Sequence, residues 1–196
     1  MRRAILRMAP ALALLFLVAG LVGPTITRAD SKGNVNFIIG GKGLDSDWEP
    51  NEDQGEFGAE VTWGPAGWPI AFATDILASS AAADILGVEV NDQSSELAFG
   101  VRKIWEAGAA RPYIGGGVAK LEAQREANGV TRKDSTLGGW VGGGIFWRLG
   151  ARFNIGIAAR ISRGEITLMS SGVPQDVEAG GSHAGLILGW GWPAHK

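Results

Sequence analysis

The side chains that could carry nucleophilic catalysis are few in this chain of 196 residues. It contains no cysteine and only two histidines, His183 and His195. Ser182 directly precedes His183, and adjacent side chains of a β-strand point to opposite faces, so the two cannot form a nucleophile–base pair. We therefore expect no catalytic residue, and we interpret His183 as a polar residue at the rim or in the interior of a β-structure.

Acidic side chains gather in residues 44–55 and could in principle bind a cation. After Asp45 and Asp47 the sequence continues Glu49-Pro50-Asn51, which breaks the D-x-D-x-D-G frame of a calcium-binding loop. Gly115 and Gly117 have the spacing of a dinucleotide-binding loop, but no helical segment follows them. The sequence thus predicts neither a metal site nor a cofactor.

The first 29 residues have the pattern of a secretory signal peptide. Arg2, Arg3 and Arg7 are followed by a short apolar run and then by small residues ending at Ala29. The apolar run is shorter than the roughly 20 residues that a membrane-spanning helix needs. We expect cleavage after residue 29, which makes residues 30–196 the mature domain.

The charge of the mature domain argues against a nucleic-acid partner. Loss of residues 1–29 leaves 14 basic residues against 20 acidic ones. An acidic exported protein lacks the basic patch with which a protein binds the phosphate backbone. Mean hydropathy is near neutral, at +0.08, so the fold must spread its apolar residues thinly.

From residue 34 onward the apolar residues recur with a period of two, which is typical of β-strands. Eight segments carry this alternation, at residues 34–40, 56–63, 68–77, 96–105, 112–124, 136–149, 152–162 and 185–192. The strands that contain them are predicted to be roughly nine to thirteen residues long, close to the length of a tilted strand that crosses a bilayer. Short connections at 64–67, 106–110 and 148–151 alternate with long ones at 44–55, 79–93, 124–134 and 164–180. Such alternation is typical of outer-membrane barrels.

Six of the eight tryptophans lie at strand ends beside the short connections, where an indole suits a membrane interface. This predicted interface girdle comprises Trp63, Trp68, Trp105, Trp147, Trp190 and Trp192.

Three segments resemble the eight-stranded outer-membrane β-barrel domain of the OmpA/OmpX/OmpW type. Residues 95–102 (SELAFGVR) are similar to its fourth strand, residues 111–118 (RPYIGGGV) to its R-P-Y-x-G-x-G strand start, and residues 142–149 (GGGIFWRL) to its sixth strand. The resemblance implies an all-β, eight-stranded, antiparallel, up-and-down transmembrane barrel in the cell outer membrane of a Gram-negative envelope. It also implies contact with outer-membrane lipid and, during biogenesis, with the outer-membrane assembly machinery. Such chains usually end on an aromatic residue, whereas here residues 193–196 follow Trp192.

If the apolar face meets lipid, the opposite face should place charges of both signs inside the barrel. These predicted interior residues are Lys42, Glu56, Glu60, Asp75, Glu96, Arg102, Arg152 and Arg160. An unpaired charge in a narrow lumen is costly, so we expect a salt-bridge network; the alternative is a charged gate for a small solute. Glu96 should pair with Lys42 or Arg160.

The sequence favours a non-enzymatic outer-membrane barrel with an envelope-structural or porin-like, small-solute-conducting role. One alternative is a lipid-modifying barrel enzyme, which would need a serine two residues after its histidine, where this chain has Gly185. Another is a secreted soluble β-barrel carrier, which would turn its apolar face inward.

Overall fold

The computed structural model describes residues 31–170 and 173–192. Ten strands and one short 3-10 helix make up the fold: β1 (Ser31–Gly43), η1 (Ser46–Trp48), β2 (Asp53–Pro65), β3 (Ala71–Ile85), β4 (Val88–Ile104), β5 (Ala110–Ala127), β6 (Val130–Leu149), β7 (Phe153–Arg163), β8 (Glu165–Ser170), β9 (Val173–Glu178) and β10 (Gly181–Trp192). Within this part of the chain, no helix has the length and apolar character needed to cross a membrane. The predicted signal peptide lies outside the described residues.

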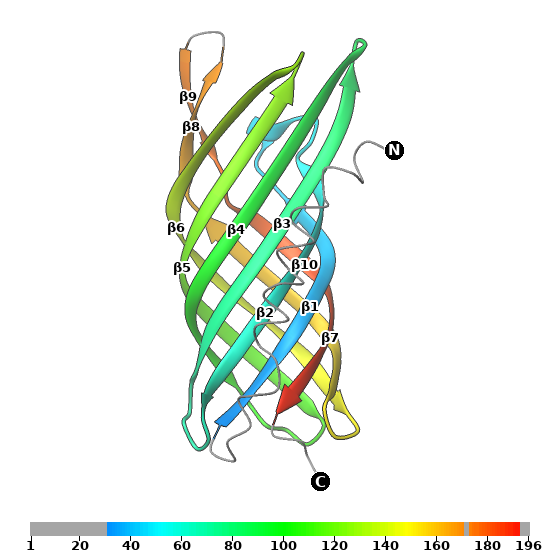
Figure 1. The fold of residues 1–196 in the computed structure, drawn as a ribbon, viewed down its shortest axis with the longest axis vertical. Coiled ribbons are helices and arrows are strands. Elements are labelled where there is room, and N and C mark those ends of the chain that lie inside the picture. The colour runs from blue at the N-terminus through cyan, green and yellow to red at the C-terminus, as the bar shows by residue number, and fades with distance from the viewer. Residues whose placement is uncertain (1–30, 171–172, 193–196) are drawn as a thin grey trace.

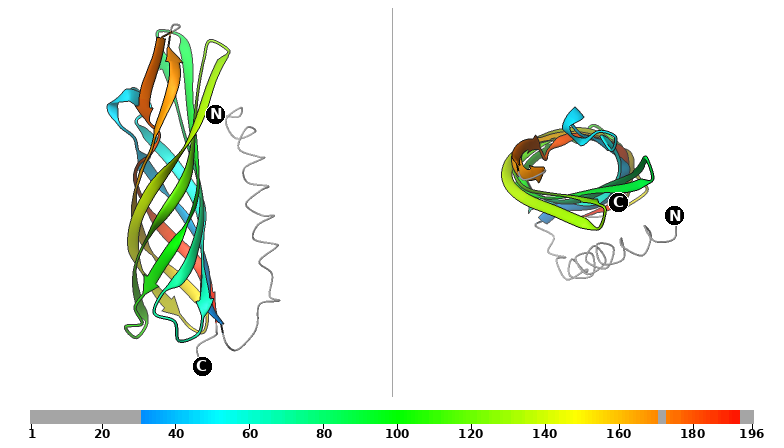
Figure 2. Two further views of the ribbon diagram at one scale, coloured as in Figure 1. Left: turned by 90° about the vertical axis from the view of Figure 1, so that its left-hand side faces the viewer. Right: turned by 90° about the horizontal axis from the view of Figure 1, so that it is seen from above.

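Eight of the strands close into one antiparallel barrel, which confirms the predicted fold class. Each strand pairs with its neighbours in the order β1-β10-β7-β6-β5-β4-β3-β2, and β1 closes the ring by pairing with both β10 and β2 (Figures 1 and 2). The three predicted short turns, the start of β1 and the end of β10 all lie at one end, the short-turn end (Figure 1). The β3–β4 and β5–β6 hairpins project at the other, the hairpin end (Figure 1).

The prediction of long loops at 79–93 and 124–134 is wrong, because both segments continue the strands as tight hairpins. β4, β5 and β6 therefore reach 17, 18 and 20 residues, longer than predicted. Leu86 and Gly87 turn the first hairpin with φ of 53° and 85°, and Asn128 and Gly129 turn the second with φ of 51° and 74°. Two successive residues with positive φ match the twist of a two-residue hairpin.

The predicted long connections 44–55 and 164–180 do lie at the hairpin end, but each contains local structure. η1 sits in the first, and the two-stranded β8–β9 hairpin occupies most of the second (Figure 2). Both long connections are therefore structured segments at the hairpin end of the barrel.

The two faces of the barrel wall have the polarity predicted for a membrane barrel. Phe99, Ile157 and Leu188 expose 44–53% of their surface to the outside, whereas the interior holds most of the buried polar and charged side chains. A soluble carrier needs the reverse arrangement, so the structure contradicts that alternative.

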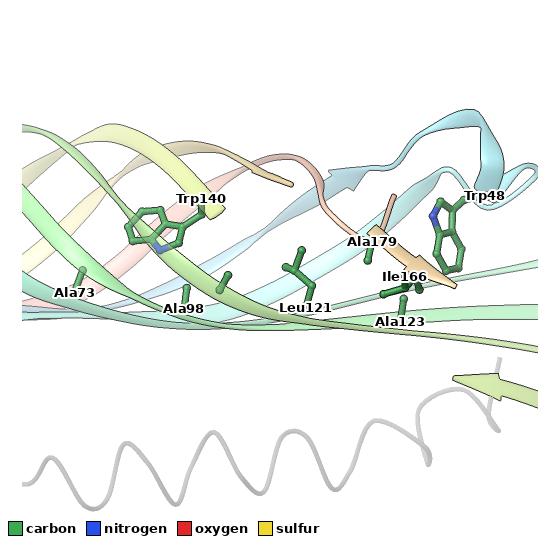
Figure 3. Close-up of a cluster of buried hydrophobic side chains, with 9 residues drawn as sticks. Trp48, Ala73, Ala98, Leu121, Ala123, Trp140, Ile166 and Ala179 are labelled. Carbon is green, nitrogen blue, oxygen red and sulfur yellow. The ribbon is translucent and has the colours of Figure 1, made fainter. Parts of the chain in front are cut away.

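Apolar side chains inside the barrel form two clusters. One cluster runs from Ala73 and Ala98 through Leu121 to Ile166, with Trp140 and Trp48 toward its opposite ends (Figure 3). The second gathers Ile38, Leu77, Tyr113, Phe146 and Ile187. The charged residues of the interior are therefore packed against apolar ones and are not free in water.

Candidate functional site

Seven of the eight predicted interior charges are buried inside the barrel. These are Lys42, Glu56, Glu60, Asp75, Glu96, Arg102 and Arg160. Arg152 is the exception and corrects the prediction: it is exposed, in the turn just before β7 begins at Phe153. Its position in the alternating pattern matches the inward face, but the strand starts one residue later.

Asp75 on β3 joins Arg102 and Arg160. Arg102 Nη2 donates to both carboxylate oxygens of Asp75, at 3.2 and 3.0 Å, and Arg160 Nη1 donates to Asp75 Oδ2 at 2.9 Å. Arg102 also donates to Glu60 at 3.1 Å and to Thr62 at 2.7 Å. Charge-assisted hydrogen bonds of this kind are roughly twice as strong as neutral ones, so this cluster ties β2, β3, β4 and β7 together across the lumen.

Glu96 pairs with Arg160, one of the two partners expected for it. Lys42, the other candidate, donates instead to Ser94 Oγ and to the carbonyl oxygen of Ala179, each at 3.1 Å. Arg160 therefore bridges Asp75 and Glu96, and the network extends from the Asp75 cluster toward the hairpin end.

Aromatic rings pack on the two guanidinium groups. The Arg160 guanidinium lies 4.2 Å from the ring centroid of Trp140, and that of Arg102 lies 5.1 Å from the ring centroid of Tyr113. The Tyr113 hydroxyl donates to Glu60 at 3.3 Å. The rings fill space that water would otherwise occupy, and cation–π contact partly compensates the arginines for lost hydration.

A second polar chain in the interior was missed by the sequence analysis. His183 Nδ1 lies 2.6 Å from Glu56 Oε2, and His183 Nε2 lies 3.0 Å from Ser162 Oγ. The order serine–histidine–glutamate is that of a hydrolase triad, and the serine comes from another strand, not from Ser182. Since His183 pairs with Arg160 in the β10–β7 register, Ser162 is its diagonal neighbour; only that register could have revealed it.

Ser162 is fully buried. One cavity beside Glu56 and His183 has a volume of about 20 Å3, which suffices for a single water molecule. A larger cavity of about 640 Å3 also touches His183, but its lining includes neither Ser162 nor Glu56. The chain of hydrogen bonds satisfies buried polar groups, which would otherwise be costly.

The connection between β1 and β2 places Trp48 inside the barrel toward the hairpin end (Figure 3). Trp48 is buried, and its indole N–H donates to the carbonyl oxygen of Glu178 at 2.8 Å. Arg125 stacks on its ring at 5.1 Å, donates to the Trp48 carbonyl oxygen at 3.0 Å and pairs with Asp92 at 2.8 Å. Together, Trp48, Arg125 and Asp92 form a lid over the interior, which we call the Trp48 lid.

Five of the six predicted girdle tryptophans have exposed rings. Trp63, Trp68, Trp105, Trp147 and Trp190 each expose 41–53% of their surface. Trp192 differs, because it is only partly exposed and lines a cavity at the short-turn end. The two tryptophans left out of the prediction, Trp48 and Trp140, are buried in the interior.

No group of three or more histidine, cysteine, aspartate or glutamate residues suited to a metal ion occurs among the described residues. His195 lies outside them.

Comparison with solved structures finds eight-stranded outer-membrane barrels. Outer membrane protein OprG of Pseudomonas aeruginosa matches with a TM-score of 0.58 at 12% identity, over 84% of this chain and 97% of that one. Ail, the attachment invasion locus protein of Yersinia pestis, matches with a TM-score of 0.53 at 11% identity, over 84% and 100%. Neisserial surface protein A matches with a TM-score of 0.52 at 12% identity, over 82% and 95%.

These likenesses confirm the predicted resemblance at the level of the fold. No protein-family model matches the chain, and no curated protein matches it in sequence.

Proposed function

We propose that this chain is an exported, non-enzymatic β-barrel of the outer membrane that acts as a structural element of the envelope and does not conduct solutes. An apolar outer wall bordered by exposed tryptophans at the short-turn end is the surface that a bilayer requires. The similar solved structures are outer-membrane barrels, which supports the same location.

The observation that carries the proposal is the Asp75 cluster, which crosses the lumen. Asp75 is 1% exposed and binds arginines from β4 and β7 at 2.9–3.2 Å. A solute passing this level would have to separate these ion pairs in a poorly hydrated space, and breaking a buried pair costs about 3–5 kcal/mol. The Trp48 lid adds a second obstruction at the hairpin end.

The enzymatic alternative has one observation in its favour, the Ser162–His183–Glu56 chain. The burial of Ser162 and the small cavity beside the other two residues weigh against it, because a substrate has no room to reach the serine oxygen. We therefore assign this chain of residues a structural role.

Two measurements test the proposal. Cell fractionation followed by gel electrophoresis with and without heating should place a heat-modifiable band in the outer-membrane fraction. In planar bilayers, the purified protein should give no stepwise conductance. A soluble protein without heat-modifiable migration would refute the location. Reproducible conductance steps would refute the structural role and favour small-solute conduction.

A further inference from the structure

A cavity of about 210 Å3 opens into the barrel interior at the short-turn end. It is lined by residues of β1, β2, β3, β4, β5, β6 and β10 and of the β2–β3 and β4–β5 turns. Arg102 lies on its inner boundary, and the Asp75 cluster closes the lumen behind that residue. The cavity is thus a blind vestibule, which we call the basal vestibule.

The charge of the basal vestibule is unbalanced. Besides Arg102, which is neutralised by Glu60 and Asp75, the lining includes Lys32, Arg111 and Arg148. Of the described residues in the lining, one is a carboxylate, Glu106, which pairs with Arg111 at 3.1 Å while 62% of its side chain remains exposed. Three cations therefore face one carboxylate that is largely in solvent.

Two of these cations lack a carboxylate partner among the described residues. Neither Lys32 nor Arg148 forms an ion pair there, in contrast to Arg102, Arg125 and Arg160. Among the described residues, Arg148 makes one side-chain hydrogen bond, from Nε to Asn154 Oδ1, at 3.1 Å. That bond orients the guanidinium and leaves its two Nη groups, the fork that recognises a carboxylate, unused.

The backbone of β10 makes room for this guanidinium. Its Nη2 and Cζ atoms occupy the space in which a Cβ atom on Gly191 would lie. Glycine at this position therefore lets Arg148 pack against β10 while still lining the vestibule. The arginine is positioned by the fold and is not a freely moving surface chain.

The remaining wall of the basal vestibule is largely apolar. Ile104 and Phe146 line it from the barrel interior, and Trp68 and Ile70 line it from the β2–β3 connection. At about 30 Å3 for each water-sized group, 210 Å3 holds about seven such groups. This is the size of a small organic molecule with a single charged head.

We propose that the basal vestibule binds a small organic monocarboxylate, whose carboxylate pairs with Arg148 and Lys32 and whose apolar body contacts Phe146 and Ile104. A carboxylate satisfies both the unused guanidinium fork and the excess positive charge. An inorganic anion such as phosphate could pair with the fork and satisfy the charge, but it would leave the apolar wall facing water. A neutral molecule would leave both cations unpaired.

The purified full barrel in nanodiscs of zwitterionic lipid tests this proposal by calorimetry, with empty nanodiscs as the reference. Benzoate is the probe, benzyl alcohol is its neutral counterpart of similar size, and inorganic phosphate is the anion without an apolar body. We expect saturable binding of benzoate, and binding at least about ten-fold weaker for the other two probes. Equal affinity for phosphate would overturn the assigned ligand class, and absence of saturable benzoate binding would overturn the site.

Four variants locate the binding. Arg148→Gln should weaken benzoate binding by about ten-fold or more. Arg148→Lys keeps the charge but loses the fork, so it should also weaken binding, but less than Arg148→Gln does. Gly191→Ala keeps every charge but displaces the guanidinium, and it should also weaken binding. Arg152→Gln removes an exposed cation at the same end of the barrel without touching the vestibule, and it should leave binding unchanged.

If Arg152→Gln weakened benzoate binding as much as Arg148→Gln, the binding would reflect general electrostatic attraction, and the proposed site would be refuted. Heat-modifiable gel migration of each variant shows that the barrel is folded before binding is compared. Because calorimetry measures binding in the basal vestibule, its outcome does not depend on whether the barrel conducts solutes.

Discussion

Replacing Asp75 by asparagine removes the carboxylate that joins Arg102 and Arg160. The amide has nearly the same shape, so the change removes charge without creating a cavity. Asp75 accepts bonds at 2.9, 3.0 and 3.2 Å in a site that is 1% exposed. After the substitution, one amide oxygen replaces two charged oxygens, and the amide N–H groups face guanidinium groups that can only donate.

The expected loss of stability follows from what each arginine keeps. Removing one partner of a buried ion pair costs about 3–5 kcal/mol. Arg102 retains Glu60 at 3.1 Å, and Arg160 retains Glu96. Neither guanidinium is left entirely without a carboxylate, so we expect Asp75→Asn to lower the free energy of unfolding by about 3 kcal/mol, at the lower end of that range.

Denaturant unfolding of the barrel in lipid vesicles, followed by tryptophan fluorescence and by gel migration, measures this loss. Asp47→Asn is the matched control, because Asp47 is exposed in η1, and it should change stability by less than about 0.5 kcal/mol. Combining Asp75→Asn with Arg160→Gln should cost less than the sum of the two single changes, since the two residues are bonded. Wild-type stability for Asp75→Asn, or strict additivity in the double variant, would show that the cluster does not brace the lumen.

Three further changes test other parts of the structure. Phe99→Arg places a charge on the outer wall and should lower the free energy of unfolding in vesicles by about 2–4 kcal/mol, while Phe99→Leu stays near wild type. If the arginine variant were as stable as the wild type, the assignment of the two faces would be reversed. Trp48→Ala should cost about 3–5 kcal/mol in the same unfolding assay and make the hairpin end easier for a protease to cut, and unchanged protection would mean that the Trp48 lid is not closed. Leu86→Asn should raise stability by up to about 1 kcal/mol, because Leu86 has a φ of 53° that asparagine tolerates better; a loss of stability would contradict the turn geometry.

The alternation of residue types by itself determined which face of each strand meets lipid and which meets the lumen. A side-chain period of two assigns every residue of a strand to one of two faces, and in this chain one face is apolar and the other is small, polar or charged. Glycine, alanine and paired charges suit a narrow interior, while isoleucine, phenylalanine and leucine suit the outer wall. The number of barrel strands and the placement of seven interior charges followed from this pattern.

The same pattern did not predict how far the strands extend beyond the apolar outer wall at the hairpin end. Residues 79–93 and 124–134 are rich in small and polar side chains and lack the apolar alternation of the other segments, although hydrogen bonding continues through them. Backbone pairing does not require apolar side chains once a hairpin stands clear of the membrane. The prediction that Arg152 lies in the interior was wrong for a related reason, since the alternation of faces does not reveal at which residue a strand begins.

Only the tertiary structure decided which interior residues meet. The pattern narrowed the partner of Glu96 to Lys42 or Arg160, and the assembled barrel brought Glu96 to Arg160. It also brought Ser162, His183 and Glu56 together from β7, β10 and β2, a grouping that no local spacing indicates. The physical reason is that a residue's face depends on its own strand, whereas its partner depends on the register of every strand between the two, and that register is set by closure of the whole barrel.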